Sequence, residues 1–189
     1  SELFFLEANI TPGMSGVESS GSQRLLVISR NDIREVAHTT FSGIGQGSYG
    51  IFLNGGNNVE ITNNVIAGMR GGNVGNASYT VACGIRIQAG TGHRLYYNTI
   101  HLFGEYDQPA TGGASAAALA ITNTAVNNLD VRNNIFSNQL SSVSTSTGIY
   151  FAAIWLAQNY NFATSTFDHN AYAVRNNSQN LVARFGNFA

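Results

Sequence analysis

The residues of this sequence that are best suited to chemistry are two glutamates and an arginine. Glu35, Glu60 and Arg94 each stand in a short run in which apolar residues alternate with polar ones. If these runs are neighbouring strands in one register, the three side chains meet on one surface, where two carboxylates could share a proton or hold Ca²⁺. The favoured interpretation is an ion-pair ladder, because Arg94 would lie between Glu60 and Asp130. We therefore predict no catalytic residue, metal ligand or cofactor, with Ca²⁺ as the alternative.

The element that would position these residues is clearest between Gly50 and Gly68, in the segment GIFLNGGNNVEITNNVIAG. Apolar and polar residues alternate there in three short runs, which is typical of strands that bury one face. Asn and Gly stand between the runs, and they supply the positive φ angles that tight corners require. Three strands and three corners in about 25 residues are typical of one coil of a parallel β-helix.

This pattern recurs along the chain in three columns. The corner before the third strand holds an asparagine at intervals of 34, 36 and 36 residues, and we place Thr39 at the same corner 25 residues earlier. The predicted corner column is Thr39, Asn64, Asn98, Asn134 and Asn170. The first strands are residues 26–28, 51–53, 85–87, 119–121 and 154–156, and the middle strands end at Val36, Ile61, Leu95, Val131 and Phe167. Three columns in one register predict an all-β fold, a parallel β-helix solenoid of about five to six coils.

The repeats also predict the domain organisation. We interpret residues 1–24 as a partial coil and loop, and residues 25–189 as the β-helix. The longer repeats gain their extra residues at one corner, after the third strand, at residues 69–82, 104–117 and 138–151. Simple surface loops are the favoured interpretation, and binding through residues such as Tyr106 is the alternative. Neither end has a polar cap, which indicates a segment that is continued by more coils or covered by neighbours.

Two columns of side chains have contrasting interpretations. Stacked coils place equivalent residues about 4.8 Å apart, so the asparagine column predicts a structural ladder of amides that satisfies its own polar groups. The outward column of the first strand is Val27, Phe52, Arg86, Ala120 and Trp155. Arg86 and Trp155 could stack on sugar rings, although Val27 and Ala120 interrupt the platform.

The composition argues against nucleic acid and membrane partners. The 189 residues include no lysine, carry a net charge of −1 and contain no apolar run long enough to span a membrane. Only 10% of the residues are charged, and Asn, Ser, Thr and Gly carry most of the polarity. This composition is typical of secreted β-solenoids, so we expect an extracellular or cell-surface location. The single Cys83 excludes an internal disulfide and fits a buried position.

The segments GIFLNGGNNVEITNNVIAG, NTIHLFG and NNLDVRNNIFSNQ resemble the right-handed parallel β-helix proteins of the pectate-lyase-like superfamily. More narrowly, they look like the β-helix regions of large secreted bacterial surface proteins. The resemblance covers most of the chain from about Leu25 onward. It implies the fold rather than one function, since the superfamily contains lyases, hydrolases, epimerases and non-catalytic adhesins.

The motifs of the catalytic members are incomplete in this sequence. Polygalacturonase-like hydrolases carry Asn-Thr-Asp and Gly-His-Gly, whereas Asn123-Thr124 is followed here by Ala125, and residues 92–94 are Gly-His-Arg. We therefore expect a non-catalytic structural or adhesive segment, with glycans or neighbouring protein subunits as partners. One alternative is a polysaccharide lyase or glycoside hydrolase that acts on acidic polysaccharide. Another is a subunit of an extracellular assembly stacked end to end.

Overall fold

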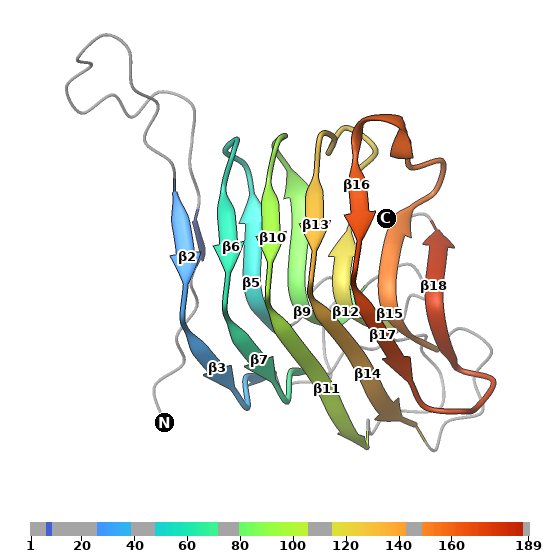
Figure 1. Cartoon of the computed structure of the whole chain (residues 1–189). Helices are drawn as coiled ribbons and strands as arrows, with labels where there is room; N and C mark the ends of the chain where they lie inside the picture. Colours follow the sequence, from blue (N-terminus) through green and yellow to red (C-terminus); the bar gives the residue numbers. More distant parts are fainter. Residues whose placement is uncertain are drawn as a thin grey trace, which may run out of the picture.

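The chain folds into a parallel β-solenoid, in which three sheets surround one hydrophobic core (Figure 1). The computed structural model describes residues 7–8, 26–38, 48–71, 80–105, 115–142 and 149–186. All strand pairs within these residues are parallel, and each strand pairs with the equivalent strand of the next coil. The predicted all-β parallel β-helix is therefore confirmed.

Each coil contributes one strand to each sheet. The first sheet is β1 (Glu7–Ala8), β5 (Ser48–Asn54), β9 (Thr80–Ala89), β12 (Ser115–Ile121), β15 (Tyr150–Ala157) and β18 (Asn180–Gly186). The second sheet is β2 (Val27–Ser29), β6 (Glu60–Thr62), β10 (Arg94–Tyr96), β13 (Asp130–Arg132) and β16 (Thr166–Asp168). The third sheet is β3 (Asp32–Arg34), β7 (Val65–Ala67), β11 (Thr99–Glu105), β14 (Ile135–Ser141) and β17 (Ala171–Val174).

Three shorter elements complete the described part of the chain. β4 (Ala37–His38) pairs with β8 (Arg70–Gly71), and the 3₁₀ helix η1 (Phe162–Thr164) connects β15 to β16. The predicted five to six coils fit only roughly. β1 has two residues, and among the described strands β18 has no successor in the second or third sheet.

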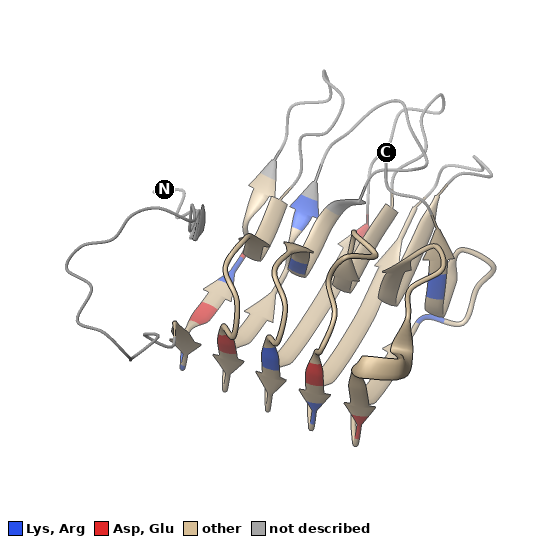
Figure 2. Cartoon of the chain, turned by 90° about the horizontal axis from the view of Figure 1, so that it is seen from above, with Lys and Arg blue, Asp and Glu red and all other residues tan. Residues whose placement is uncertain are grey.

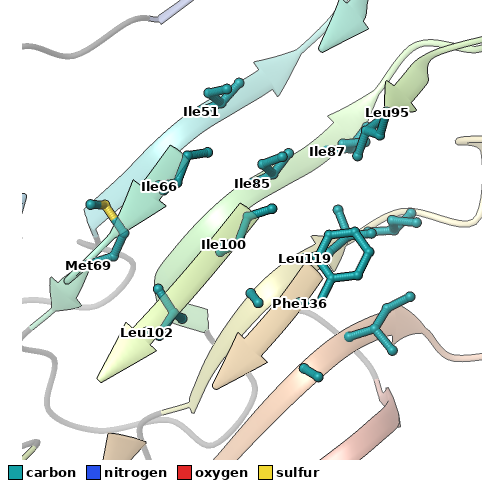
Figure 3. Packing of buried hydrophobic residues seen from close by; sticks show 14 of the residues in the cluster. Ile51, Ile66, Met69, Ile85, Ile87, Leu95, Ile100, Leu102, Leu119 and Phe136 are labelled. Carbon is teal, nitrogen blue, oxygen red and sulfur yellow. The ribbon is translucent and has the colours of Figure 1, made fainter. Parts of the chain in front are cut away.

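Apolar side chains from the three sheets fill the space between them (Figure 3). The inward column of the second sheet is Ile28, Ile61, Leu95, Val131 and Phe167. Ile61, Leu95 and Val131 are completely buried, and full burial of such a side chain stabilises the fold by roughly 1.5–3 kcal/mol. The core therefore forms by stacking equivalent apolar residues, coil upon coil.

The strands of the first sheet share a bend that gives this sheet a second apolar surface. Gly50 and Ile51 both face the core, since Ile51 belongs to the core cluster and a Cβ on Gly50 would collide with Ile66. Their neighbours Tyr49 and Phe52 both lie on the outer side, with ring centroids 5.3 Å apart. The same outer positions in later strands form a separate buried cluster of Cys83, Ala117, Ala120, Ala152 and Trp155.

A ladder of asparagine side chains follows the corner between the second and third sheets. Its members are Asn31, Asn64, Asn98, Asn134 and Asn170. At each step the backbone N–H and Nδ2 of one asparagine donate to Oδ1 of the next, at 2.9–3.1 Å. Asn64, Asn98 and Asn134 are each only 1% exposed, so the ladder satisfies polar groups that burial would otherwise leave unpaired. The predicted structural ladder is confirmed from Asn64 to Asn170.

The residue before each ladder asparagine has a positive φ angle, which turns the chain at the corner. The preceding residues are Arg30, Asn63, Tyr97, Asn133 and His169, with φ angles of 58°, 55°, 56°, 56° and 52°. This left-handed conformation costs roughly 1–2 kcal/mol for residues other than glycine. Residues as different as arginine and tyrosine adopt it here, which indicates that the stacking of neighbouring coils stabilises the corner.

The register predicted for the first coil is wrong. Val27–Ser29 pairs with Glu60–Thr62 in the second sheet, and Asp32–Arg34 pairs with Val65–Ala67 in the third. Asn31, rather than Thr39, therefore begins the ladder, and Thr39 lies outside the described residues.

Two other predicted columns are also wrong in the first coil, because they depend on the same register. Ile28 takes the inward position predicted for Val36, and Glu7 stands beside Phe52 where Val27 was expected. The prediction used a step of 25 residues, whereas the observed step from Asn31 to Asn64 is 33 residues, close to the later steps. Of the predicted partial coil in residues 1–24, only Glu7–Ala8 lies within the described residues, and it pairs in the first sheet.

Removing one ladder side chain should destabilise the solenoid strongly. In Asn98→Ala, both donors of Asn64 lose their acceptor in a buried corner, so we expect the free energy of unfolding to fall by about 2–4 kcal/mol. Urea unfolding followed by circular dichroism measures this loss. Asn54→Ala, at an exposed strand end, is the matched control and should change stability by less than about 0.5 kcal/mol. Equal losses in the two variants would contradict a structural ladder.

Candidate functional site

The outward side chains of the second sheet form the most charged surface among the described residues. We name this surface the charged face and define it by Glu60, Thr62, Arg94, Tyr96, Asp130, Arg132, Thr166 and Asp168. Glu60, Arg94 and Asp130 occupy one column on β6, β10 and β13. Figure 2 shows the resulting alternation of acidic and basic positions across successive strands. The predicted neighbourhood of Glu60, Arg94 and Asp130 is confirmed.

Within this face, Asp130 is the centre of the hydrogen bonding. Arg132 Nε lies 2.5 Å from Asp130 Oδ1 on the same strand, and the Tyr96 hydroxyl donates to Asp130 Oδ2 at 2.7 Å. Burial raises the pKa of Tyr96, and the hydrogen bond to Asp130 and the charge of Asp130 raise it further. Tyr96 therefore stays protonated as a donor, and Asp130 is held by two neighbours.

Arg94 differs from the other arginines of the second and third sheets. Arg34 pairs with Asp32 at 2.6 Å and Arg132 with Asp130. Arg94 is exposed, and among the described residues no carboxylate lies within 4.0 Å of its guanidinium nitrogens. The expected cross-strand ion pair between Arg94 and its column neighbours is therefore absent from this part of the chain. Its guanidinium remains available for an external anion.

Glu35 does not belong to the charged face. Because of the first-coil register, Val27 is the column neighbour of Glu60. Glu35 lies in the corner after β3, where its Oε2 is 3.1 Å from Arg70 Nη2. The predicted adjacency of Glu35 and Glu60, on which proton sharing and a Ca²⁺ site depended, is wrong. Within the described ranges, no group of three His, Cys, Asp or Glu side chains is placed to hold a metal ion.

Arg86 and Trp155 do share the predicted outward column of the first sheet, which continues to Arg184. Arg86 lies 5.0 Å from the Phe52 ring centroid and donates to the Tyr49 hydroxyl at 2.7 Å. Trp155 is only 1% exposed, so its ring does not offer a platform for sugars in this conformation. The expected sugar-stacking surface is instead a packed layer of arginine and aromatic side chains.

A second arginine stack in this column was not anticipated from the sequence. Arg184 lies 3.6 Å from the Tyr150 ring centroid and 4.8 Å from that of Trp155. Tyr49 stands three residues before Phe52, whereas Tyr150 stands five residues before Trp155, so the sequence shows no common spacing that predicts this stack. Of the other predicted site residues, Tyr106 lies outside the described residues.

Comparisons with known proteins identify no family for this chain. No family model, curated protein or solved structure matches the chain. Within the described residues, no helix has the length and apolar character needed to cross a membrane.

His93 is the one fully buried imidazole in the described part of the chain, at the corner before β10. Its Nδ1 accepts the Val59 backbone N–H at 3.3 Å, and its Nε2 lies 3.1 Å from the Ala89 carbonyl. Burial lowers the pKa of His93, and the hydrogen bond to Ala89 offsets part of this effect. The neutral ring with its proton on Nε2 satisfies both contacts.

This imidazole should make stability depend on pH. Below the ordinary histidine pKa of about 6.5 the unfolded chain binds a proton that folded His93 resists, so stability is complete above that pH and falls as the solution becomes more acidic. Urea midpoints between about pH 8 and pH 5 measure this loss. His93→Gln keeps a donor and an acceptor without titrating, and it should reduce the acid loss. His101→Gln, which removes an exposed imidazole, is the control. An equal change in pH dependence in both variants would contradict the assignment.

Proposed function

We propose that this chain is a rigid, non-catalytic scaffold of a secreted or cell-surface protein, which binds acidic glycans through its charged face. The observation that carries the proposal is the position of Arg94, an exposed guanidinium without a carboxylate partner among the described residues, between Glu60 and Asp130 in one column. A guanidinium recognises a planar carboxylate by two parallel hydrogen bonds. The carboxylate of a uronic acid has this geometry.

The neighbours of Arg94 suit the rest of a sugar. Glu60 and Asp130 are only partly buried, and their oxygens accept hydrogen bonds from hydroxyl groups. Tyr97, directly after β10, is 61% exposed, and its ring offers an apolar surface of the kind that sugar faces contact. One sugar would then find a protein partner for its carboxylate, for its hydroxyl groups and for its apolar face. These partners lie within about two strand spacings, close to 10 Å.

The repeating architecture supports the scaffold part of the proposal. Neighbouring strands hold Glu60, Arg94 and Asp130 about 4.8 Å apart, and the buried core behind them fixes their spacing. The composition, without lysine and rich in Asn, Ser, Thr and Gly, favours an extracellular setting. Cleavage of the same acidic polysaccharide is the competing function, and the binding experiment separates the two.

Acidic glycan binding should depend on Arg94. A glycan array that includes oligouronides identifies the ligand, and titration calorimetry should then show at least a tenfold loss of affinity in Arg94→Ala, equal to about 1.4 kcal/mol. Arg34→Ala removes an arginine that is paired with Asp32 on the third sheet, so it should retain wild-type affinity.

The same purified chain is assayed for oligouronide cleavage with and without Ca²⁺. Binding without cleavage, lost only in Arg94→Ala, is the expected result. Equal losses in the two arginine variants, or no acidic glycan bound at all, would contradict the binding role. Turnover would replace the scaffold with a lyase or hydrolase.

A further inference from the structure

Glu60 carries a second charge of the charged face that no described neighbour compensates. The residue is only partly buried, and among the described residues no cationic nitrogen lies within 4.0 Å of its carboxylate oxygens. In its column, β2 supplies the apolar Val27 on one side, and β10 supplies Arg94 on the other. The carboxylate of Glu60 is therefore available to a ligand in the same way as the guanidinium of Arg94.

Asp130, on the other side of Arg94, differs from Glu60. Its Oδ1 lies 2.5 Å from Arg132 Nε, and its Oδ2 accepts a hydrogen bond from the Tyr96 hydroxyl at 2.7 Å. A ligand cation at Asp130 would have to compete with the charge of Arg132. The two carboxylates beside Arg94 are thus not equivalent, and Glu60 is the one that offers an uncompensated negative charge.

Glu60 and Arg94 form a pair of opposite charges whose charged groups do not meet in this structure. Their Cα atoms are partners on neighbouring strands, about 4.8 Å apart. No guanidinium nitrogen of Arg94 lies within 4.0 Å of a Glu60 oxygen. An exposed ion pair contributes little to stability in any case, so a ligand can hold the two groups apart at small cost. The pair therefore offers one positive and one negative contact to the same ligand.

A glycan with carboxylates alone fits this pair poorly. When Arg94 holds one carboxylate, a second negative group of the ligand one strand spacing away would face Glu60 at about 5 Å. Like charges repel at this distance, which is shorter than the Debye length of about 8 Å at physiological salt. An ammonium group in the same place would instead form a charge-assisted hydrogen bond with Glu60.

We infer that the charged face selects glycans that carry both charges, with a uronic acid carboxylate on Arg94 and the free ammonium group of an amino sugar on Glu60. The two ligand groups stand about one strand spacing apart, close to 5 Å, a separation that groups on neighbouring sugars of one chain can have. This inference rests on the proposed glycan binding and adds the class of glycan to it. Glu60 then accepts from an ammonium group rather than from a neutral hydroxyl.

Two oligosaccharides that differ in one group test this selectivity. Both alternate glucuronic acid with glucosamine, but the amino groups are free in one and acetylated, hence uncharged, in the other. At about pH 6.5 the uronic acids are ionised and most free amino groups are protonated. Titration calorimetry of the full chain should show at least tenfold tighter binding of the free-amine form. Equal affinity for the two forms, or tighter binding of the acetylated form, would overturn the inference.

Glu60→Gln isolates the contribution of the negative charge, because it keeps the size of the side chain. This variant should bind the two oligosaccharides equally, and it should bind the acetylated form at least as tightly as the wild type does, since a repulsion is removed. An unfolded variant could not retain this binding. Glu35→Gln makes the same change of net charge at a carboxylate that pairs with Arg70 away from the charged face. It is the matched control and should keep the wild-type preference. A preference for the free amine that survives in Glu60→Gln would contradict the role of this residue.

The same titrations distinguish a failure of this inference from a failure of the glycan site itself. Arg94→Ala should weaken the binding of both oligosaccharides, because it removes the carboxylate contact that they share. If Arg94→Ala weakens binding while the wild type does not discriminate between the two forms, the glycan site stands and the selectivity for two charges is wrong. If the wild type binds neither form, nor an oligouronide, both proposals are wrong.

Discussion

The structure depends on one recurring hydrogen-bond arrangement, in which the amide of a corner is satisfied by a side chain from the next coil. A chain that turns sharply between the second and third sheets must bury its backbone N–H where no strand partner is available. Asn64, Asn98 and Asn134 meet this demand by accepting from the asparagine of the preceding coil. Among the described ladder steps, no coil supplies the acceptor for the backbone N–H of its own corner. Stability is therefore shared between neighbours, as expected for a solenoid.

This dependence runs in one direction along the ladder, and it separates the inward positions of the coils from the outward ones. The ladder and the core fix the inward positions of every coil, while the outward positions can vary. The charged face, the arginine-aromatic layer of the first sheet and the exposed Ile135 on the third sheet show how different those sides are. We therefore propose glycan recognition for one of these outward faces.

The fold was largely predictable, because a solenoid repeats its constraints in the sequence. The columns through Ile61, Asn64 and Glu60 were assigned correctly in all later coils, since their steps of 34 and 36 residues are regular. The register of the first coil was predicted wrongly, because Thr39 was placed in the asparagine column although its step to Asn64 is shorter than the later steps. The segment VISRND matches EITNNV in its hydroxyl residue, positive-φ residue and asparagine, and that match would have identified Asn31. Burial of Trp155 could not be predicted, because it follows from a bend in the first sheet that places two consecutive residues on the core side.

The central claim, a directional ladder that satisfies each buried corner amide from the next coil, is tested most directly by residue-resolved hydrogen exchange. The account predicts that the backbone amides of Asn64, Asn98 and Asn134 exchange only through global unfolding. Rapid exchange at Asn98 under conditions in which the chain is folded would contradict it.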